Sequence, residues 1–119
     1  MVKLDEPVGI YEDVQAKIDV PAEVQTFVGR KIPRGHVLKV EEAAITDLTT
    51  ANTLLCLGKR DATGQDHWIK CQTGANTHTC NLVAYPILKE CEQPIARVTT
   101  PTVDDDLYFT IYGWLYKYP

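Results

Sequence analysis

The side chains of this 119-residue chain that are best suited to chemistry are few: His36, His67 and His78, with four cysteines. The sequence contains no G-x-S-x-G or H-E-x-x-H motif and no Gly-rich phosphate loop. Catalysis needs a nucleophile, base or metal that neighbouring residues hold in place. Because no recognised arrangement of this kind is present, we predict a non-enzymatic protein without a cofactor.

The cysteines are Cys56, Cys71, Cys80 and Cys91, and three of them combine with His78 in the spacing C-x6-H-x-C-x10-C. His78 and Cys80 would share one face of a strand, but this spacing matches no common zinc module. Buried free cysteines behave as small hydrophobic residues, and this is the interpretation we favour for Cys56, Cys71 and Cys80. A disulfide between neighbouring strands is the main alternative, and it would suit a particle exposed to a harsh exterior.

The densest carboxylate cluster is Asp104–Asp106, which offers the oxygen ligands that Ca²⁺ prefers. Adjacent residues of a strand point to opposite faces, and the alternate acidic spacing of an EF-hand is absent. We therefore predict a turn here and no metal site. Asp61, Gly64 and Asp66 are likewise interpreted as turn residues.

The elements that would position any site begin with the C-terminal segment 107–118, which reads L-Y-F-T-I-Y-G-W-L-Y-K-Y. A period of two predicts a strand with an apolar core face and an opposite face rich in aromatic residues. The core face comprises Leu107, Phe109, Ile111, Gly113 and Leu115. The other face comprises Tyr108, Thr110, Tyr112, Trp114, Tyr116 and Tyr118.

Short alternating segments separated by turn residues predict the other strands. The expected strands are 14–20, 24–32, 36–48, 53–58, 67–72, 79–88 and 95–99, with loops at 59–66, 73–78 and 89–94. Leu38 and Val40 have one parity while Ala43 and Ile45 have the other, which predicts a β-bulge at Glu41–Glu42. Residues 53–58 are apolar on both parities and so predict a central, covered strand, whereas Pro86 predicts an edge position or a strand end.

About eight strands at a spacing of roughly ten residues are typical of a sandwich or barrel. We predict an all-β, eight-stranded antiparallel jelly-roll sandwich over residues 14–119, with residues 1–13 as a loosely held N-terminal arm.

The net charge of −4 and the pI near 5.3 give no indication of nucleic-acid binding. Arg30, Lys31 and Arg34 form the only local basic patch, which we interpret as solvated. The sequence contains no stretch of eighteen apolar residues, so we expect no transmembrane helix, and the acidic N-terminus argues against a signal peptide. We expect assembly in a cytoplasm, with no membrane partner.

The aromatic face is the strongest functional signal, because aromatic residues with a polar tip suit a surface that another surface covers. Cover by the chain's own arm or loops, cover by a neighbouring subunit, and an open platform for stacking sugar rings are the alternatives. We favour the subunit. The candidate interface residues are Tyr108, Tyr112, Trp114 and Tyr116, with Val14, Ala16 and Ile18 as a strand that adds to a partner's sheet edge.

The order of turn and strand residues in three segments resembles that of a known class of proteins. The segments are I-P-R-G-H-V-L-K-V (32–40), C-L-G-K-R-D (56–61) and P-T-V-D-D-D-L-Y-F-T-I-Y-G-W-L-Y (101–116). The chain resembles small jelly-roll virion proteins, especially the capsid decoration (cement) proteins of tailed bacteriophages. The resemblance implies a structural protein of the virion that forms a homo-oligomer such as a trimer and binds the viral capsid protein. It transfers no catalytic residue. The alternative function is a lectin-like carbohydrate-binding module that uses Trp114 and the tyrosines, with polar contacts from loops 59–66 and 73–78.

Overall fold

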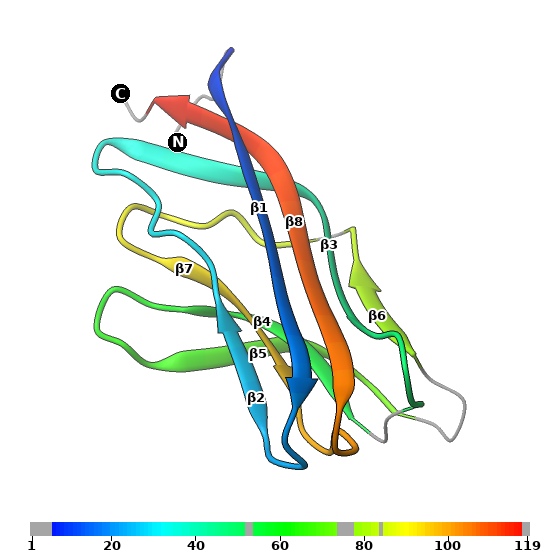
Figure 1. Ribbon diagram of the computed structural model, residues 1–119. Helices are drawn as coiled ribbons and strands as arrows, with labels where there is room; N and C mark the ends of the chain where they lie inside the picture. Colours follow the sequence, from blue (N-terminus) through cyan, green and yellow to red (C-terminus); the bar gives the residue numbers. More distant parts are fainter. Residues whose placement is uncertain (1–5, 52–53, 74–77, 84, 118–119) are drawn as a thin grey trace.

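The computed structural model describes residues 6–51, 54–73, 78–83 and 85–117, and these form two four-stranded antiparallel sheets packed face to face (Figure 1). The strand order is β1–β8–β3–β6 in one sheet and β2–β7–β4–β5 in the other. The strands are β1 (Pro7–Val20), β2 (Gln25–Val28), β3 (His36–Asp47), β4 (Leu55–Arg60), β5 (Asp66–Gln72), β6 (Thr79–Leu82), β7 (Gln93–Val98) and β8 (Asp105–Lys117). Among the described residues, no helix has the length and apolar character needed to cross a membrane.

The pairing of the strands is nested: β1 pairs with β8, β2 with β7, β3 with β6 and β4 with β5, all antiparallel. This pattern arises when one long hairpin of four strand pairs rolls up into two sheets, and it defines the eight-stranded jelly roll. The predicted fold class is therefore confirmed.

The core lies between the inner faces of the two sheets. Leu107, Phe109 and Ile111 of β8 are buried there, as their parity predicts, and the Phe109 ring lies 6.0 Å from the ring of Phe27 on β2. Burying an aliphatic or aromatic side chain of this size contributes about 1.5–3 kcal/mol, so these contacts hold the sheets together. Leu55–Gly58 is buried along its whole length between β7 and β5, which confirms the predicted central strand.

Several predicted boundaries are wrong. The strand expected over 24–32 ends at Val28, and the loop expected over 59–66 is shorter, because β4 runs to Arg60 and β5 begins at Asp66. Residues 7–13, expected in a loose arm, belong to β1, where they continue the ladder with β8 from Pro7 onward; residues 1–5 lie outside the described part of the chain. The strand expected over 79–88 ends at Leu82, and beyond it only Leu88 forms a bridge, to Leu38 of β3. Pro86, which has no N–H to donate to a ladder, lies beyond the end of β6, and β6 is an edge strand as predicted.

The predicted bulge in β3 is confirmed by a register shift between Val40 and Glu42 against β8. The shift brings the β3 backbone so close to Gly113 that a Cβ there would lie 2.3 Å from the Lys39 carbonyl oxygen. β4 and β5 show the same relationship, because a Cβ on Gly58 would lie 2.2 Å from the His67 carbonyl oxygen beside another register shift. Both glycines are therefore required by close backbone approach.

The cysteines form one disulfide, between Cys56 of β4 and Cys71 of β5, which face each other in the ladder. The prediction of free core cysteines is thus wrong for this pair, and the alternative of a disulfide between neighbouring strands is confirmed. Cys80 is free and buried as predicted, and Cys91 is free and half-buried. The disulfide removes Cys71 from the zinc set that the spacing suggested.

One flank of the sandwich, between β1 and β2, is joined by side chains. Lys17 Nζ donates to the Thr26 carbonyl at 2.8 Å, and Gln15 Nε2 donates to the Val28 carbonyl at 2.8 Å. The Tyr11 hydroxyl donates to the Arg30 carbonyl at 2.7 Å. These inward-pointing residues of β1 connect the edges of the two sheets without a backbone ladder.

Candidate functional site: the aromatic face

The candidate site is the outer face of the β1–β8–β3 ladder. The register pairs Ile10 with Trp114, Val14 with Thr110 and Ala16 with Tyr108, so β1 and β8 present their side chains in rows. Paired residues of antiparallel strands lie on the same side of a sheet. Because Tyr11 and the odd-numbered residues of β8 point into the core, these rows point away from it.

Many large apolar and aromatic side chains on this face are exposed to solvent. Ile10 is 66 % exposed, Val14 63 %, Tyr112 50 % and Trp114 39 %. A monomeric soluble protein rarely exposes so many large apolar side chains side by side, and such patches mark interaction surfaces. We call this surface the aromatic face, and it comprises Ile10, Val14, Ala16, Ile18, Tyr108, Tyr112, Trp114 and Tyr116.

The structure brings the sequence-predicted interface residues together on this one face. Val14, Ala16 and Ile18 are exposed on β1, and Tyr108 and Tyr116 are half-buried on β8. Ile10 is not among the predicted interface residues, because it lies in the segment that the sequence predicts to be an arm. Its signal was present in the sequence, since Ile10 has the same parity as Val14 and Ile18.

Charged side chains border the aromatic residues in an ordered way. Glu12 of β1 and Glu42 of β3 are the ladder partners of Tyr112, one on each side. The next row places Lys39 of β3 beside Trp114. The face therefore combines an apolar centre with carboxylates and an ammonium group in adjacent rows of the ladder.

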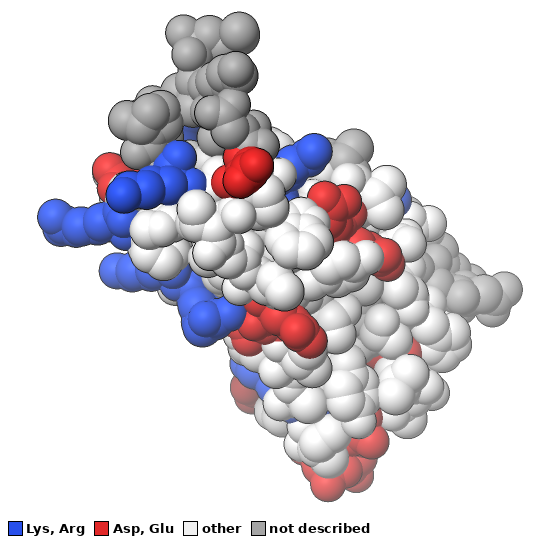
Figure 2. Space-filling view, turned by 90° about the horizontal axis from the view of Figure 1, so that it is seen from above, with Lys and Arg blue, Asp and Glu red and all other residues white. Residues whose placement is uncertain are grey.

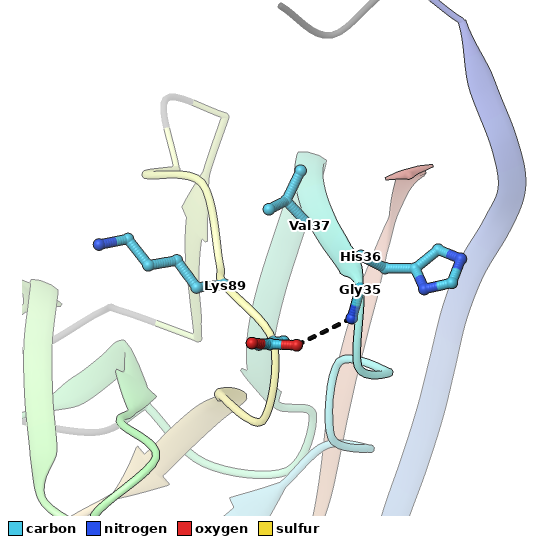
Figure 3. Close-up of a pocket in the computed structure, with 5 residues that line it drawn as sticks. Gly35, His36, Val37 and Lys89 are labelled. Atoms are coloured by element: carbon cyan, nitrogen blue, oxygen red, sulfur yellow. Dashed lines mark hydrogen bonds between the residues drawn. The ribbon is translucent and has the colours of Figure 1, made fainter. Parts of the chain in front are cut away.

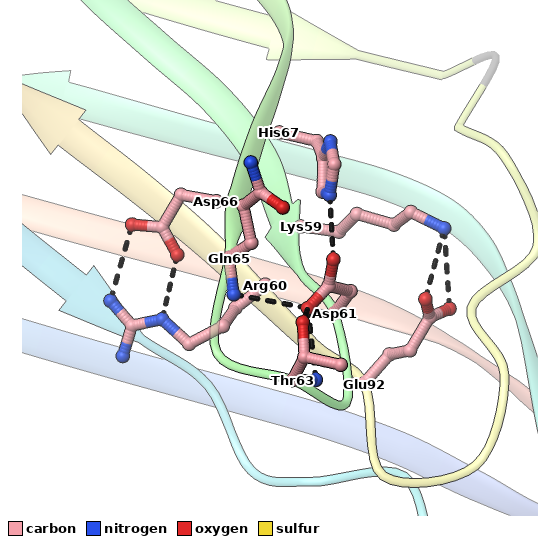
Figure 4. A network of polar contacts seen from close by, with 8 residues as sticks. All are labelled: Lys59, Arg60, Asp61, Thr63, Gln65, Asp66, His67 and Glu92. Carbon is pink, nitrogen blue, oxygen red and sulfur yellow. Dashed lines mark hydrogen bonds and ion pairs between the residues drawn. The ribbon is translucent and has the colours of Figure 1, made fainter.

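The loop between β4 and β5 is organised by Asp61 (Figure 4). Its Oδ1 accepts from the Thr63 hydroxyl at 2.6 Å and from the Gln65 N–H at 3.0 Å, and its Oδ2 lies 2.8 Å from His67 Nε2. Hydrogen bonds from Thr63, His67 and the Gln65 N–H hold the pKa of Asp61 well below its usual range. With Gly64 at a φ of +91°, the predicted turn chemistry is confirmed for Asp61 and Gly64. It is wrong for Asp66, which begins β5 opposite Arg60.

Neighbouring charges in this region are also paired (Figure 4). Arg60 Nε lies 2.7 Å from Asp66 Oδ1, and Lys59 Nζ lies 3.1 Å from Glu92 Oε2. Arg60 and Asp66 of segment 59–66 therefore bind each other, while Lys59 binds a residue of the β6–β7 connection. In loop 73–78, residues 74–77 lie outside the described part of the chain, and His78 Nδ1 lies 2.9 Å from the Asp47 carbonyl oxygen.

A cavity of about 340 Å³ lies between the β2–β3 and β6–β7 connections, lined by Gly35, His36, Val37, Lys89 and Glu90 (Figure 3). Glu90 Oε2 accepts the Gly35 N–H at 2.8 Å, and the His36 ring points away from Lys89. This lining brings no nucleophile and base together.

Metal-ligating side chains do not gather anywhere in the described residues: no three of His, Cys, Asp or Glu are placed to hold an ion. In the segment Asp104–Asp106, Asp105 is buried while Asp104 is exposed, as expected of a turn leading into a strand.

Comparison with known proteins yields little. No family model matches the chain, and no curated protein matches it in sequence. Among solved structures, the chain is similar to the Drosophila NLP core, a structure described as providing insight into pentamer formation and histone binding, with a TM-score of 0.45 and 11% identity over 90% of this chain and 97% of that one. A similarity this low carries no argument about function.

Proposed function

We propose that this protein is a structural protein of a virus particle, without enzymatic activity, that self-associates through the aromatic face and binds the capsid shell. The observation that supports this proposal best is the exposure of Ile10, Val14, Tyr112 and Trp114 on one continuous sheet face. Covering such a face by a protein surface removes apolar area from water, which is the main driving force of association.

The charges on the face are compatible with a second copy as the occupant. A two-fold interface brings the same patch of both subunits together, so each charge must find its complement within that patch. Glu12 and Glu42 lie one row from Lys39, so two copies related by a two-fold axis can pair ammonium with carboxylate. Many subunits bound to one shell would each contribute a modest contact, and these contacts together would give a stable coat.

Light scattering on the purified protein tests self-association. We expect a fixed oligomer for the wild type and dissociation of Trp114→Ala, because truncating an aromatic anchor at an interface costs about 2 kcal/mol or more, roughly 30-fold in Kd. Val83→Ala is the matched control, since Val83 is 68 % exposed but lies in the β6–β7 connection. A wild type that stays monomeric at all concentrations would contradict the proposal.

The virion role has a separate test. Peptides of this chain should be detected by mass spectrometry in density-purified particles from cells that produce the protein. Their absence from the particles, with the protein present in the lysate, would remove the virion role while leaving self-association standing.

A carbohydrate-binding module is the second candidate, and one specific observation favours it. Tyr112 and Trp114 offer ring faces, and the carboxylates of Glu12 and Glu42 flank Tyr112, where they can accept sugar hydroxyls. The paired charges of loop 59–66 do not add to such a site. Titration of the protein with a panel of oligosaccharides, followed by tryptophan fluorescence, distinguishes the two: saturable quenching that Trp114→Ala abolishes supports the sugar platform, and no response supports the structural role.

A further inference from the structure

The two ends of the sandwich differ in charge, since one is acidic and the other is mainly basic but also carries Glu90. The connections at the lower end of Figure 1, residues 21–24, 48–54 and 99–104, contain Glu23 and Asp104 and no lysine or arginine. Asp19 and Asp106 border them. At the upper end, the β2–β3 connection contains Arg30, Lys31 and Arg34, and Figure 2 shows Lys and Arg side chains gathered on one side of that end.

The acidic end also presents apolar side chains. Leu48 is 63 % exposed, Val103 60 % and Val24 54 %, one from each of its three connections. We call these three residues the aliphatic tip. Turns at the end of a sandwich are usually polar, so large aliphatic residues in all three connections favour contact with another surface.

Backbone hydrogen bonds hold the connections that carry the aliphatic tip. The Leu48 N–H donates to the Asp106 carbonyl at 3.0 Å, and the Asp104 N–H donates to the Val20 carbonyl at 2.8 Å. The Asp19 N–H donates to Asp106 Oδ1 at 3.1 Å. A surface fixed in this way loses little conformational entropy on binding.

We propose that the aliphatic tip of one copy binds the basic end of a second copy, so that the chains associate head to tail. The basic end provides the complement in charge, through the exposed side chains of Lys31 and Arg34. The molecule is 46 Å long, so the two surfaces lie far apart and cannot meet within one chain. Such a heterologous contact generates a ring if it closes and a filament if it does not.

This contact is separate from the aromatic face and goes beyond the proposed function. It is therefore tested in the Trp114→Ala background, where association through the aromatic face is lost. Lys31→Glu/Arg34→Glu makes the basic end acidic, and Glu23→Lys/Val103→Lys makes the acidic end basic. All four positions are exposed, and circular dichroism melts verify that each variant folds.

Sedimentation velocity gives the readout, at about 0.05 M and 0.5 M salt because screening weakens exposed charge pairs at the higher value. We expect concentration-dependent association of the Trp114→Ala protein at low salt, its loss in either charge variant alone, and its recovery as one-to-one complexes when the two variants are mixed. Val83→Lys should associate as before. A Trp114→Ala protein that remains monomeric at low salt, or mixed variants that form no complex, would overturn the head-to-tail contact without affecting the tests of the aromatic face.

Discussion

The Thr50 hydroxyl donates a hydrogen bond of 2.8 Å to Oδ1 of Asp105, and so joins the β3–β4 connection to the first residue of β8. Oδ2 of the same carboxylate accepts the Thr102 N–H at 2.8 Å. Asp47, also fully buried, accepts the N–H groups of Thr49 and Thr50, each at 3.1 Å, and is hydrogen-bonded to Asp105. Two buried carboxyl groups thus organise the acidic end from within.

A hydrogen bond between two carboxyl groups requires a proton on one of them. Burial raises the pKa of Asp105, but hydrogen bonds from Asp47, the Thr102 N–H and the Thr50 hydroxyl outweigh it, and its pKa lies below the ordinary value. We therefore expect Asp105 to be the acceptor of the pair and Asp47 the donor, which amide substitutions can test.

Amide substitutions separate the two roles. Asp47→Asn keeps an acceptor for Thr49 and Thr50 and supplies an N–H donor toward Asp105, so we expect a change in unfolding free energy within about 0.5 kcal/mol. Asp105→Asn replaces an acceptor with a donor that faces other donors, and should cost about 1–3 kcal/mol. Urea unfolding at pH 7 measures both. Equal losses in the two variants would contradict this assignment of the proton.

The same pair predicts the acid limb of the stability profile. A carboxyl group whose folded pKa lies below its unfolded value of about 3.9 stabilises the fold above that pH, and this contribution is lost as the pH falls through the folded pKa. The urea midpoint of the wild type should therefore decline below about pH 4. Asp105→Asn should show a shallower decline; a slope identical to that of the wild type would mean that Asp105 does not contribute.

Glycine substitutions test the two close backbone approaches. Gly58→Ala and Gly113→Ala each place a Cβ within 2.3 Å of a carbonyl oxygen, so both should lower the unfolding free energy by more than about 2 kcal/mol. Gly9→Ala is the control, because the nearest atom to its added Cβ is Leu115 Cδ1 at 3.9 Å. Thermal melts compare the three, and a Gly113→Ala protein as stable as Gly9→Ala would show that β3 can move away.

The disulfide predicts both a thiol count and a stability difference. Of the four cysteines, two should react with a thiol reagent after unfolding without reductant, and all four with reductant. Closing a loop of 15 residues stabilises a fold by about 3 kcal/mol, so Cys56→Ala/Cys71→Ala should lose roughly that much. Four reactive thiols without reductant would exclude the bond.

Most of the fold can be predicted from the alternation of apolar and polar residues along the strands. The aromatic segment 107–118, the covered strand over 53–58 and the bulge near Glu41 all follow from which side of a strand must be buried. The predicted strand over 79–88 is too long because apolar residues continue past Leu82. Tyr85 and Leu88 there are buried in the core although they lie outside a strand.

The disulfide pairing and the full extent of the aromatic face depend on which strands are neighbours, and the sequence pattern does not show this. The partner of Cys56 could not be read from spacing, since four cysteines allow three complete pairings and the correct bond needs β4 beside β5. The extent of the aromatic face was underestimated for the same reason: Ile10 becomes part of it only because β1 runs alongside β8 as far as Pro7.

The side chains that bridge β1 and β2 also affect whether strand edges of separate molecules can pair and aggregate. An unpaired strand edge is a template onto which another chain can polymerise. At the flank of β2, Lys17, Gln15 and Tyr11 already occupy the outward carbonyls of Thr26, Val28 and Arg30. That flank therefore offers few free carbonyl groups to a strand of a second molecule, which limits edge-to-edge aggregation there.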